Sequence, residues 1–265
     1  MIDRRRFERE GFVAGIAGLT AEETARFRAA LLQLYENTPA DLHKHFINLH
    51  GVLGWGAALG RHAAILDAVE RLLGPDVLLW KSKAFAKFPG PGQVAWHQDL
   101  PHWNLVPSEA LTAWVALTDS NGANGCVRVI RGSHRNGSRA SDADRDPNSL
   151  LSAGLKFDVA DEEARGSVPL VLKSGQFSLH HGMLVHGSGE NRTAAPRLGI
   201  AFVYIPAHVR QASAPDRHVV LVRGQDRGRF FPADPPPAGD EAAQREAACA
   251  YFARLRSGQI PYNVR

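Results

Sequence analysis

The sequence predicts a mainly β fold, a sandwich or jelly roll, with α-helices beside it. Residues 76–206 alternate short apolar runs with turn signals such as Pro89-Gly90-Pro91-Gly92 and Ser174-Gly175, and many short strands at this spacing are typical of such folds. Residues 1–75 show instead the spacing of amphipathic helices. The 265 residues contain no internal repeat and no composition change that marks a boundary, so we expect a single domain around one β core.

Two helices are predicted before the β core. Thr20-Ala21-Glu22-Glu23 is a capping box, in which a hydroxyl and a carboxylate accept hydrogen bonds from unpaired backbone N–H groups, and it begins a helix that runs to about Glu36. A second helix is expected from about Arg61 to Leu73, and Gly74-Pro75 ends it. Residues 43–55 mix aromatic and histidine residues without a clear period, and we interpret them as a loop or lid.

The predicted strands of the core are short apolar stretches bounded by Gly, Pro, Asn or Ser. They are residues 77–88, 94–99, 111–118, 126–131, 168–172, 176–180 and 197–205. The polar residues 136–148 are expected to form an exposed insertion, and four prolines within 232–239 precede a last helix over about 240–255. The domain therefore divides into a helical part over about 1–75, the β core over about 76–206 and a C-terminal extension over about 207–265.

Composition excludes several classes of protein. Hydrophobic residues at 44% and charged residues at 22% are typical of a globular chain rather than a disordered or fibrous one. No apolar stretch reaches the roughly 18 residues of a membrane span, so we expect neither export by an ordinary signal nor membrane insertion. Two cysteines and no C-x-x-C pair favour a reducing cytoplasm. The net charge of +4 is scattered, so no nucleic-acid partner is expected; the oligomeric state is left open.

The segment Trp96-His97-Gln98-Asp99 is the sharpest chemical signal. On a strand, residues two apart point to the same face, so His97 and Asp99 would present an imidazole nitrogen and a carboxylate to one point. His180, His181 and His186 each offer a third ligand. Two histidines and one carboxylate on one face of an ion form the site of non-haem Fe(II) oxygenases. The H-x-D spacing also occurs by chance, and a histidine on a strand is more often a hydrogen-bonded structural residue.

Arg197 begins a predicted strand with unequal faces. Alternation places Arg197, Gly199 and Ala201 on one face and larger apolar residues on the other. One guanidinium followed by two minimal side chains leaves room for a ligand. Because a guanidinium can bind a carboxylate through two parallel hydrogen bonds, this face suits a dicarboxylate cosubstrate.

Three segments in this order resemble the phytanoyl-CoA dioxygenase family of Fe(II)/2-oxoglutarate oxygenases. They are WHQD at 96–99, LTAWVALTDSNGANGCVRVIRGSH at 111–134 and HHGMLVHGSGENRTAAPR at 180–197. The resemblance extends over about 41–205. It implies a double-stranded β-helix, the jelly-roll core also found in cupins.

The resemblance also implies a set of ligands. The positions that match the family's iron ligands are His97, Asp99 and His186, and the position that binds the distal carboxylate of 2-oxoglutarate is Arg197. Ser188 matches a position that assists this carboxylate. The eleven-residue spacing to Arg197 and the following Gly-Ser favour His186 over the other two histidines.

Further site residues follow from position. Thr112 and Lys83 are candidate contacts of the cosubstrate. His181 is expected near the site, whereas His180 should point away if its strand continues.

Candidate substrate contacts lie in two loops. Trp103 and Asn104 follow the strand that carries the ligands, and loops at the mouth of a barrel often contact substrate; alternatively, Trp103 closes the end of the barrel. Phe46, in the segment 43–55, is expected to cover the same mouth unless that segment is permanently packed as core.

The implied activity is oxidation of a C–H bond in a small organic molecule with Fe(II), 2-oxoglutarate and O2, releasing succinate and CO2. Hydroxylation is the expected outcome, with epimerisation, desaturation or cyclisation as alternatives. A carboxylate at Asp99 argues against a halogenase, in which a small residue leaves the position to chloride. Two other hypotheses stay open: a cupin-like lyase or isomerase that uses its metal as a Lewis acid, and a non-catalytic small-molecule-binding protein.

Overall fold

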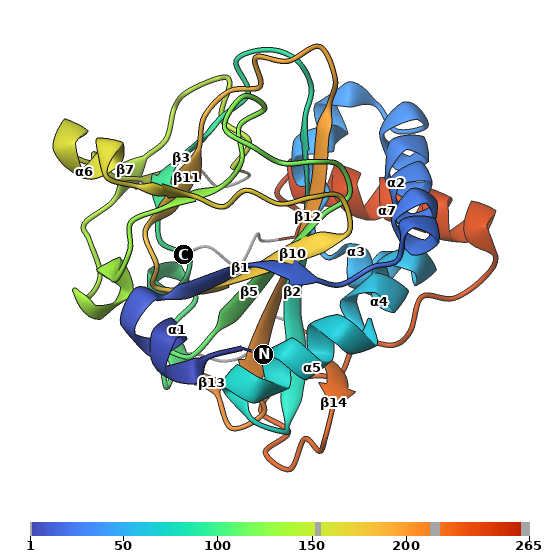
Figure 1. Cartoon of the computed structure of the whole chain (residues 1–265). Helices are drawn as coiled ribbons and strands as arrows, with labels where there is room; N and C mark the ends of the chain where they lie inside the picture. The colour runs from blue at the N-terminus through green and yellow to red at the C-terminus, as the bar shows by residue number, and fades with distance from the viewer. Residues whose placement is uncertain (1, 152–154, 213–217, 261–265) are drawn as a thin grey trace.

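Two antiparallel sheets face each other across the interior in the computed structural model, which describes residues 2–151, 155–212 and 218–260. The larger sheet has six strands in the order β1-β10-β5-β12-β2-β14. Their bounds are β1 Phe12–Ala17, β10 Gln176–His181, β5 Leu111–Ala116, β12 Arg197–Pro206, β2 Val77–Lys87 and β14 Val220–Arg223. Figure 1 shows this sheet crossing the middle of the molecule.

The smaller sheet has four strands in the order β3-β11-β6-β9. They are β3 Val94–His97, β11 His186–Ser188, β6 Arg128–Val129 and β9 Val168–Pro169. Two further pairs complete the β structure, namely β13 Arg210–Gln211 with β4 Leu105–Val106 and β7 Asp142–Ala143 with β8 Leu155–Lys156. This arrangement confirms the predicted mainly β jelly roll with flanking helices.

Helices cover the outer face of the larger sheet (Figure 1). In chain order the helices are α1 Arg4–Glu10, α2 Ala21–Glu36, η1 Ala40–His45, α3 Leu49–Val52, α4 Gly54–Gly60, α5 Ala63–Leu73, η2 Leu100–His102, η3 Ser133–Arg135, α6 Asp161–Arg165 and α7 Glu241–Arg256. In the described part of the chain, no helix combines the length and the apolar character that crossing a bilayer requires.

Local sequence signals explain the two predicted N-terminal helices. Thr20 accepts a hydrogen bond from the Glu23 backbone, and the Glu23 carboxylate accepts one from the Thr20 backbone, so the capping box begins α2 as predicted. Helix α5 ends at Gly74, whose φ of 95° lies where glycine is favoured. The last predicted helix is confirmed as α7.

The alternation predicted for β12 separates the core from the interior cavity. Leu198, Ile200 and Phe202 are at most 1% exposed and pack under the helices, and burial of each such side chain stabilises the fold by about 1.5–3 kcal/mol. The opposite face carries Arg197 and Ala201 into the space between the sheets. The strand is buried on both faces, so its two faces differ in chemistry rather than in exposure.

The prediction that residues 43–55 form a loop or lid is wrong. The segment folds into η1, α3 and α4, and Phe46 is fully buried, with ring centroids 4.7 Å from Tyr35 and 4.8 Å from Phe252. Helices of four to seven residues are too short to display a 3.6-residue period. Phe46 is therefore a core residue, and its position does not support the predicted substrate contact.

Strand β1 is a second feature that the sequence did not reveal. It pairs with β10 at the edge of the larger sheet, and its ladder is irregular between Val13 and Ile16. Gly15 lies in this irregularity with φ 74° and interrupts the alternation that would have identified a strand. The polar segment 136–148 is mostly exposed, as predicted, and carries β7.

Candidate active site

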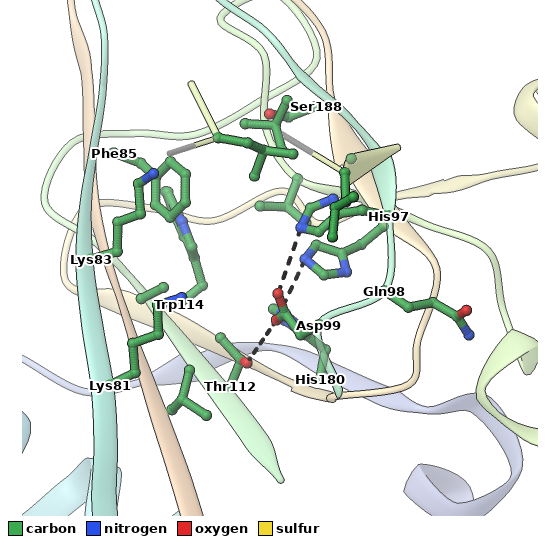
Figure 2. Close-up of a pocket in the computed structure, with 18 of the residues that line it drawn as sticks. Lys81, Lys83, Phe85, His97, Gln98, Asp99, Thr112, Trp114, His180 and Ser188 are labelled. Atoms are coloured by element: carbon green, nitrogen blue, oxygen red, sulfur yellow. Dashed lines mark hydrogen bonds and ion pairs between the residues drawn. The ribbon is translucent and has the colours of Figure 1, made fainter. Parts of the chain in front are cut away.

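A triad of two imidazoles and a carboxylate lies between the sheets. His97 ends β3 and His186 begins β11, and the two are direct partners in the antiparallel ladder. Their ring centroids are 4.1 Å apart. Asp99 Oδ1 lies 3.6 Å from His97 Nε2, and Asp99 Oδ2 lies 3.9 Å from His186 Nε2 (Figure 2). All three ligand atoms lie within 4.8 Å of one another, which is the arrangement that one metal ion would bridge.

The convergence of His97 and Asp99 has a different cause from the one predicted. Strand β3 ends at His97, and Asp99 has helical dihedral angles, φ −81° and ψ −52°. Gln98 fixes this turn, because its side-chain amide donates to Met183 O at 2.7 Å and the Asp99 backbone N–H donates to Gly182 O. A turn tied to the connection between β10 and β11, rather than the pleat of a strand, places the carboxylate.

Backbone carbonyls orient both imidazoles. His97 Nδ1 lies 2.8 Å from Ala95 O and His186 Nδ1 lies 2.9 Å from Leu184 O. A carbonyl can only accept, so each Nδ1 carries the proton and each Nε2 keeps its lone pair toward Asp99. Each imidazole thus donates to the backbone carbonyl two residues before it in the sequence. This hydrogen bond fixes the tautomer that metal binding requires.

The charge states also suit a cation. Burial, and then the neighbouring His186, lower the pKa of His97 to about 3, so its imidazole is neutral at physiological pH. Burial raises the pKa of Asp99, but the adjacent His186 and His97 more than offset this, so the pKa stays below its ordinary value. A neutral imidazole at His97 and an ionised carboxylate at Asp99 are the donor forms that a divalent metal binds.

The larger sheet forms the floor of the cavity in rows of facing residues. The row nearest the triad is His180, Thr112, Val203 and Lys81, taken from β10, β5, β12 and β2. The next row includes Trp114, Ala201 and Lys83. The far row pairs Arg197 with Lys87. The cavity thus extends from the triad toward Arg197, and all these residues except Lys87 line it.

Arg197 is a deeply buried cation of this cavity. It is 1% exposed, its guanidinium lies 4.9 Å from the Trp114 ring centroid, and its Nε and Nη1 have no hydrogen-bond partner within the described residues. Burial lowers its pKa to about 10, so it stays cationic at neutral pH. A buried cation with two unpaired donors is costly unless it meets an anion. The site therefore fits the carboxylate predicted for it.

The space predicted beside Arg197 is only partly open. A side-chain carbon at Gly199 would lie 2.2 Å from Trp114 Cζ2, so the indole already fills the room that the missing side chain leaves. This overturns the prediction that Gly199 leaves space for a ligand. Ala201, in the next row, does line the cavity.

The three remaining candidate cosubstrate residues all line the cavity. Ser188 is buried, and its carbonyl accepts from Lys87 Nζ at 3.1 Å. Lys83 Nζ donates to Leu150 O at 2.7 Å. Thr112 Oγ1 lies 3.5 Å from Asp99 Oδ2, which places its hydroxyl beside the metal ligand. Their contacts with a cosubstrate stay predictions.

The candidate substrate residues separate into different environments. Trp103 lines the cavity and is also core, because it is 5% exposed and lies edge-on to Trp80 at 5.4 Å. Trp103 therefore helps to close the cavity, and its contact with a substrate stays a prediction. Asn104 is exposed and does not line the cavity formed by the described residues. The predictions for Asn104 and for Phe46 as substrate contacts are not supported by their positions.

The expected orientations of His180 and His181 are reversed. His180 lies in the cavity, with its ring centroid 4.7 Å from that of His186. His181 lies outside it, 5.1 Å from the His134 ring and 6.5 Å from the Phe7 ring. Strand β10 ends at His181 and β11 belongs to the other sheet, so alternation cannot be counted back from His186 across the intervening turn.

Comparison with known proteins identifies the family. The sequence model described as Phytanoyl-CoA dioxygenase (PhyH) matches residues 7–199, which is most of the chain. The chain belongs to the phytanoyl-CoA dioxygenase (PhyH) family. This confirms the resemblance drawn from the three sequence segments, and the PhyH match also includes β1 and the helices α2 to α5.

Relatives and solved structures are consistent with PhyH membership. The peroxisomal phytanoyl-CoA dioxygenase of Homo sapiens is 28% identical over 168 residues, covering 60% of this chain and 46% of the relative. The chain thus spans about half the length of that relative. The ectoine dioxygenase of Streptomyces avermitilis is 24% identical, covering 84% and 85%. The apo structure of the non-heme monooxygenase ThoJ is 32% identical with a TM-score of 0.75, covering 97% and 98%, and a nickel complex of ThoJ is 31% identical.

Three residues of this cavity were not placed there by the sequence analysis: Lys81 and Trp114 were not predicted, and His180 was expected to point away. A signal existed for two of them. Trp114 lies two residues after Thr112, and Lys81 lies two before Lys83, so alternation along a strand places each on the same face as a residue already suspected. The face of His180 is set by its ladder with β5, which no local pattern shows.

Proposed function

We propose that this chain is an Fe(II)- and 2-oxoglutarate-dependent oxygenase that oxidises a C–H bond of a small organic molecule, with hydroxylation as the expected outcome. One observation carries the proposal. The cavity holds the His97, Asp99 and His186 triad together with the buried Arg197, whose Nε and Nη1 are unpaired within the described residues. Membership of the PhyH family supports it.

The triad would hold the iron through the two oriented Nε2 atoms and the Asp99 carboxylate. When bound, iron and 2-oxoglutarate supply the oxidising power, with O2 consumed and succinate and CO2 released. Thr112 stands beside the Asp99 carboxylate and limits its rotation. Metal binding by the ThoJ relative is consistent with this role.

Arg197 would bind the distal carboxylate of 2-oxoglutarate. Its two unpaired donors match a bidentate carboxylate, and stacking on Trp114 holds the guanidinium plane. Ser188 lines the same region. Phe85, Val127 and Leu155 form apolar walls, which exclude water from the reacting groups and strengthen the ion pair.

Two alternatives are less well supported. A Lewis-acid lyase or isomerase needs the triad, but it has no role for the buried Arg197, whose Nε and Nη1 are unpaired within the described residues. A binding protein without turnover would not require all three ligand atoms within 4.8 Å. The Asp99 carboxylate occupies the position that a halogenase leaves to chloride.

The domain organisation, the cellular location and the partner of this chain are also part of the proposal. We propose one domain over 1–265 because Ala248 and Phe252 of α7 join the same core cluster as the N-terminal helices; residues 1, 152–154, 213–217 and 261–265 lie outside the described residues. The free thiols of Cys126 and Cys249 are compatible with a cytoplasmic location. The partner proposed is a small-molecule substrate.

Anaerobic titration of the metal-free protein with Fe(II) and then 2-oxoglutarate tests the function. We expect the weak visible charge-transfer band of a 2-oxo acid chelated on iron, and its loss in Asp99→Ala. Asp119→Ala is the matched control, because Asp119 pairs with Lys173 on the surface. Iron binding without the band would overturn the cosubstrate role and favour the Lewis-acid alternative.

A further inference from the structure

Lys87 is a buried amine beside the Arg197 end of the cavity. It is 1% exposed and is the direct ladder partner of Arg197, so the two side chains leave adjacent strands on the same face of the larger sheet. Its Nζ donates to Ser188 O at 3.1 Å and to Gly189 O, at the end of β11 in the smaller sheet. Lys87 therefore crosses between the two sheets next to Arg197.

The charges of this region are unbalanced. Among the described residues, no carboxylate acts on Lys87 or on Arg197: the titratable groups that affect Lys87 are Arg197 and the Cys126 thiol, and those that affect Arg197 are Cys126 and Tyr35. Burial raises the pKa of both Cys126 and Tyr35, so neither becomes an anion at neutral pH. Two basic groups thus share a buried space with no anion of the described chain to offset them.

The two basic groups respond differently to this environment. Burial lowers the pKa of Arg197 to about 10, so the guanidinium stays charged at neutral pH. Burial, and then Arg197, lower the pKa of Lys87 to about 7, so its amine changes protonation near neutral pH. An anion bound to Arg197 would offset the repulsion between the two cations and favour the ammonium form of Lys87.

We propose that Lys87 is a second cation of the cosubstrate site, which takes up a proton from solvent when the distal carboxylate of 2-oxoglutarate binds Arg197. The ammonium then strengthens the binding of this carboxylate through space. Lys87 does not line the cavity formed by the described residues, so it acts as a positioning residue, through Arg197 and through the Ser188 segment that its hydrogen bonds hold. The inference rests on the proposed function and adds a proton-linked group to the same site.

The proposal ties cosubstrate affinity to pH and to the distal carboxylate. The complex would hold more protons than the free protein between about pH 7 and 8, so the affinity for 2-oxoglutarate should rise as the pH falls through this range. In 2-oxopentanoate a methyl group replaces the distal carboxylate. This acid keeps the two groups that chelate iron but does not pair with Arg197, so its binding should show no proton uptake by Lys87.

Calorimetric titration of the anaerobic Fe(II) protein at pH 7.5, in buffers of different ionisation enthalpy, measures this linkage. Binding of 2-oxoglutarate should take up about half a proton more than binding of 2-oxopentanoate, as a rise of about one unit in the pKa of Lys87 requires. Lys87→Met should abolish this difference and weaken 2-oxoglutarate binding about tenfold at pH 7. Lys87→Arg should restore the affinity without the proton uptake, because a guanidinium stays charged.

Two controls separate the role of Lys87 from the general function. Lys173→Met removes an exposed lysine that pairs with Asp119 and should behave as the wild type. The comparison of the two 2-oxo acids in the wild type tests the linkage even where a variant does not fold. Absence of the charge-transfer band with 2-oxoglutarate in the wild type defeats the proposed function itself. A normal band with equal proton uptake for both acids, or with a difference that persists in Lys87→Met, overturns the role of Lys87 alone.

Discussion

Gly199 and Trp114 occupy one shared space: a side-chain carbon at position 199 would lie 2.2 Å from Trp114 Cζ2. The indole in turn supports the Arg197 guanidinium. Gly199→Ala must therefore displace the indole, which we expect to cost about 1–3 kcal/mol of unfolding free energy and to weaken 2-oxoglutarate binding. Denaturant unfolding and calorimetry measure the two effects. Gly189→Ala is the control, because a methyl group there meets nothing within 4 Å. If both variants had the same unfolding free energy and the same 2-oxoglutarate affinity, the indole at Trp114 would not be the cause.

Arg197→Met separates binding from stability. Methionine keeps much of the volume but removes a buried cation with two unpaired donors, so the metal-free protein should melt at a higher temperature. The same variant should lose about a hundredfold or more in 2-oxoglutarate affinity, because two charge-assisted hydrogen bonds are lost. Differential scanning calorimetry measures the expected rise in melting temperature, and titration with 2-oxoglutarate measures the expected loss of affinity. An unchanged affinity would show that another cation binds the cosubstrate.

Gln98→Leu should weaken metal binding although Gln98 touches no metal. Its amide donates to Met183 O and Gly137 O and thereby holds the turn that carries Asp99. Loss of a residue that orients a ligand commonly lowers metal affinity about 10–100-fold. Competition of the apo protein with a chelating dye measures the Fe(II) affinity. Gln93→Leu, in which an exposed amide loses its bond to Asp146, serves as the comparison; equal Fe(II) affinity in the two variants would refute the role of the turn.

Lys87 predicts how stability changes in alkaline solution. Burial, and then the neighbouring Arg197, lower its pKa from 10.5 to about 7 in the folded protein. Between these values the unfolded chain holds a proton that the folded chain lacks, so the stability contributed by this residue rises with pH, by up to about 1.4 kcal/mol per pH unit. Below about pH 7 Lys87 is protonated in both states, so the folded protein bears the full destabilisation of a buried ammonium. Urea unfolding from pH 7 to 10 should show the unfolding free energy of the wild type rising relative to that of Lys87→Met. Parallel pH dependences of the two proteins would refute the role of Lys87.

Phe46→Ala tests the reassignment of this residue from lid to core. Removing a fully buried ring should cost about 3–5 kcal/mol of unfolding free energy. The charge-transfer band of the iron and 2-oxoglutarate complex should persist at a temperature where the variant is folded. A large loss of cosubstrate or substrate binding without loss of stability would restore the lid interpretation.

Regular strands explain what could be predicted from the sequence. The two faces of β12 follow from strict alternation, so the amino-acid sequence alone was enough to place Arg197 and Ala201 together on the ligand-facing side. The triad could be recognised because its residues lie in segments specific to the PhyH family. The predicted reason for the position of Asp99 was nevertheless wrong, since the hydrogen bonds that set the turn come from Met183, Gly182 and Gly137, which are distant in sequence.

Long-range pairing explains what could not be predicted. The face of His180 depends on its partner Thr112 in β5, and the burial of Phe46 depends on Phe252 in the last helix. The space at Gly199 is decided by an indole from a neighbouring strand. In each case the deciding group lies far along the chain, where neither periodicity nor a local motif reports it.

The pairing of β1 with β10 has a consequence for how the protein folds. Phe12 is the ladder partner of His180, so the first strand can find its neighbour only after most of the polypeptide has been synthesised. Sheets dominated by such distant contacts fold slowly, on the order of milliseconds to seconds, because the entropy of closing a long loop is lost before the stabilising contacts form. The β1 edge of the larger sheet is thus among the structures that we expect to form last.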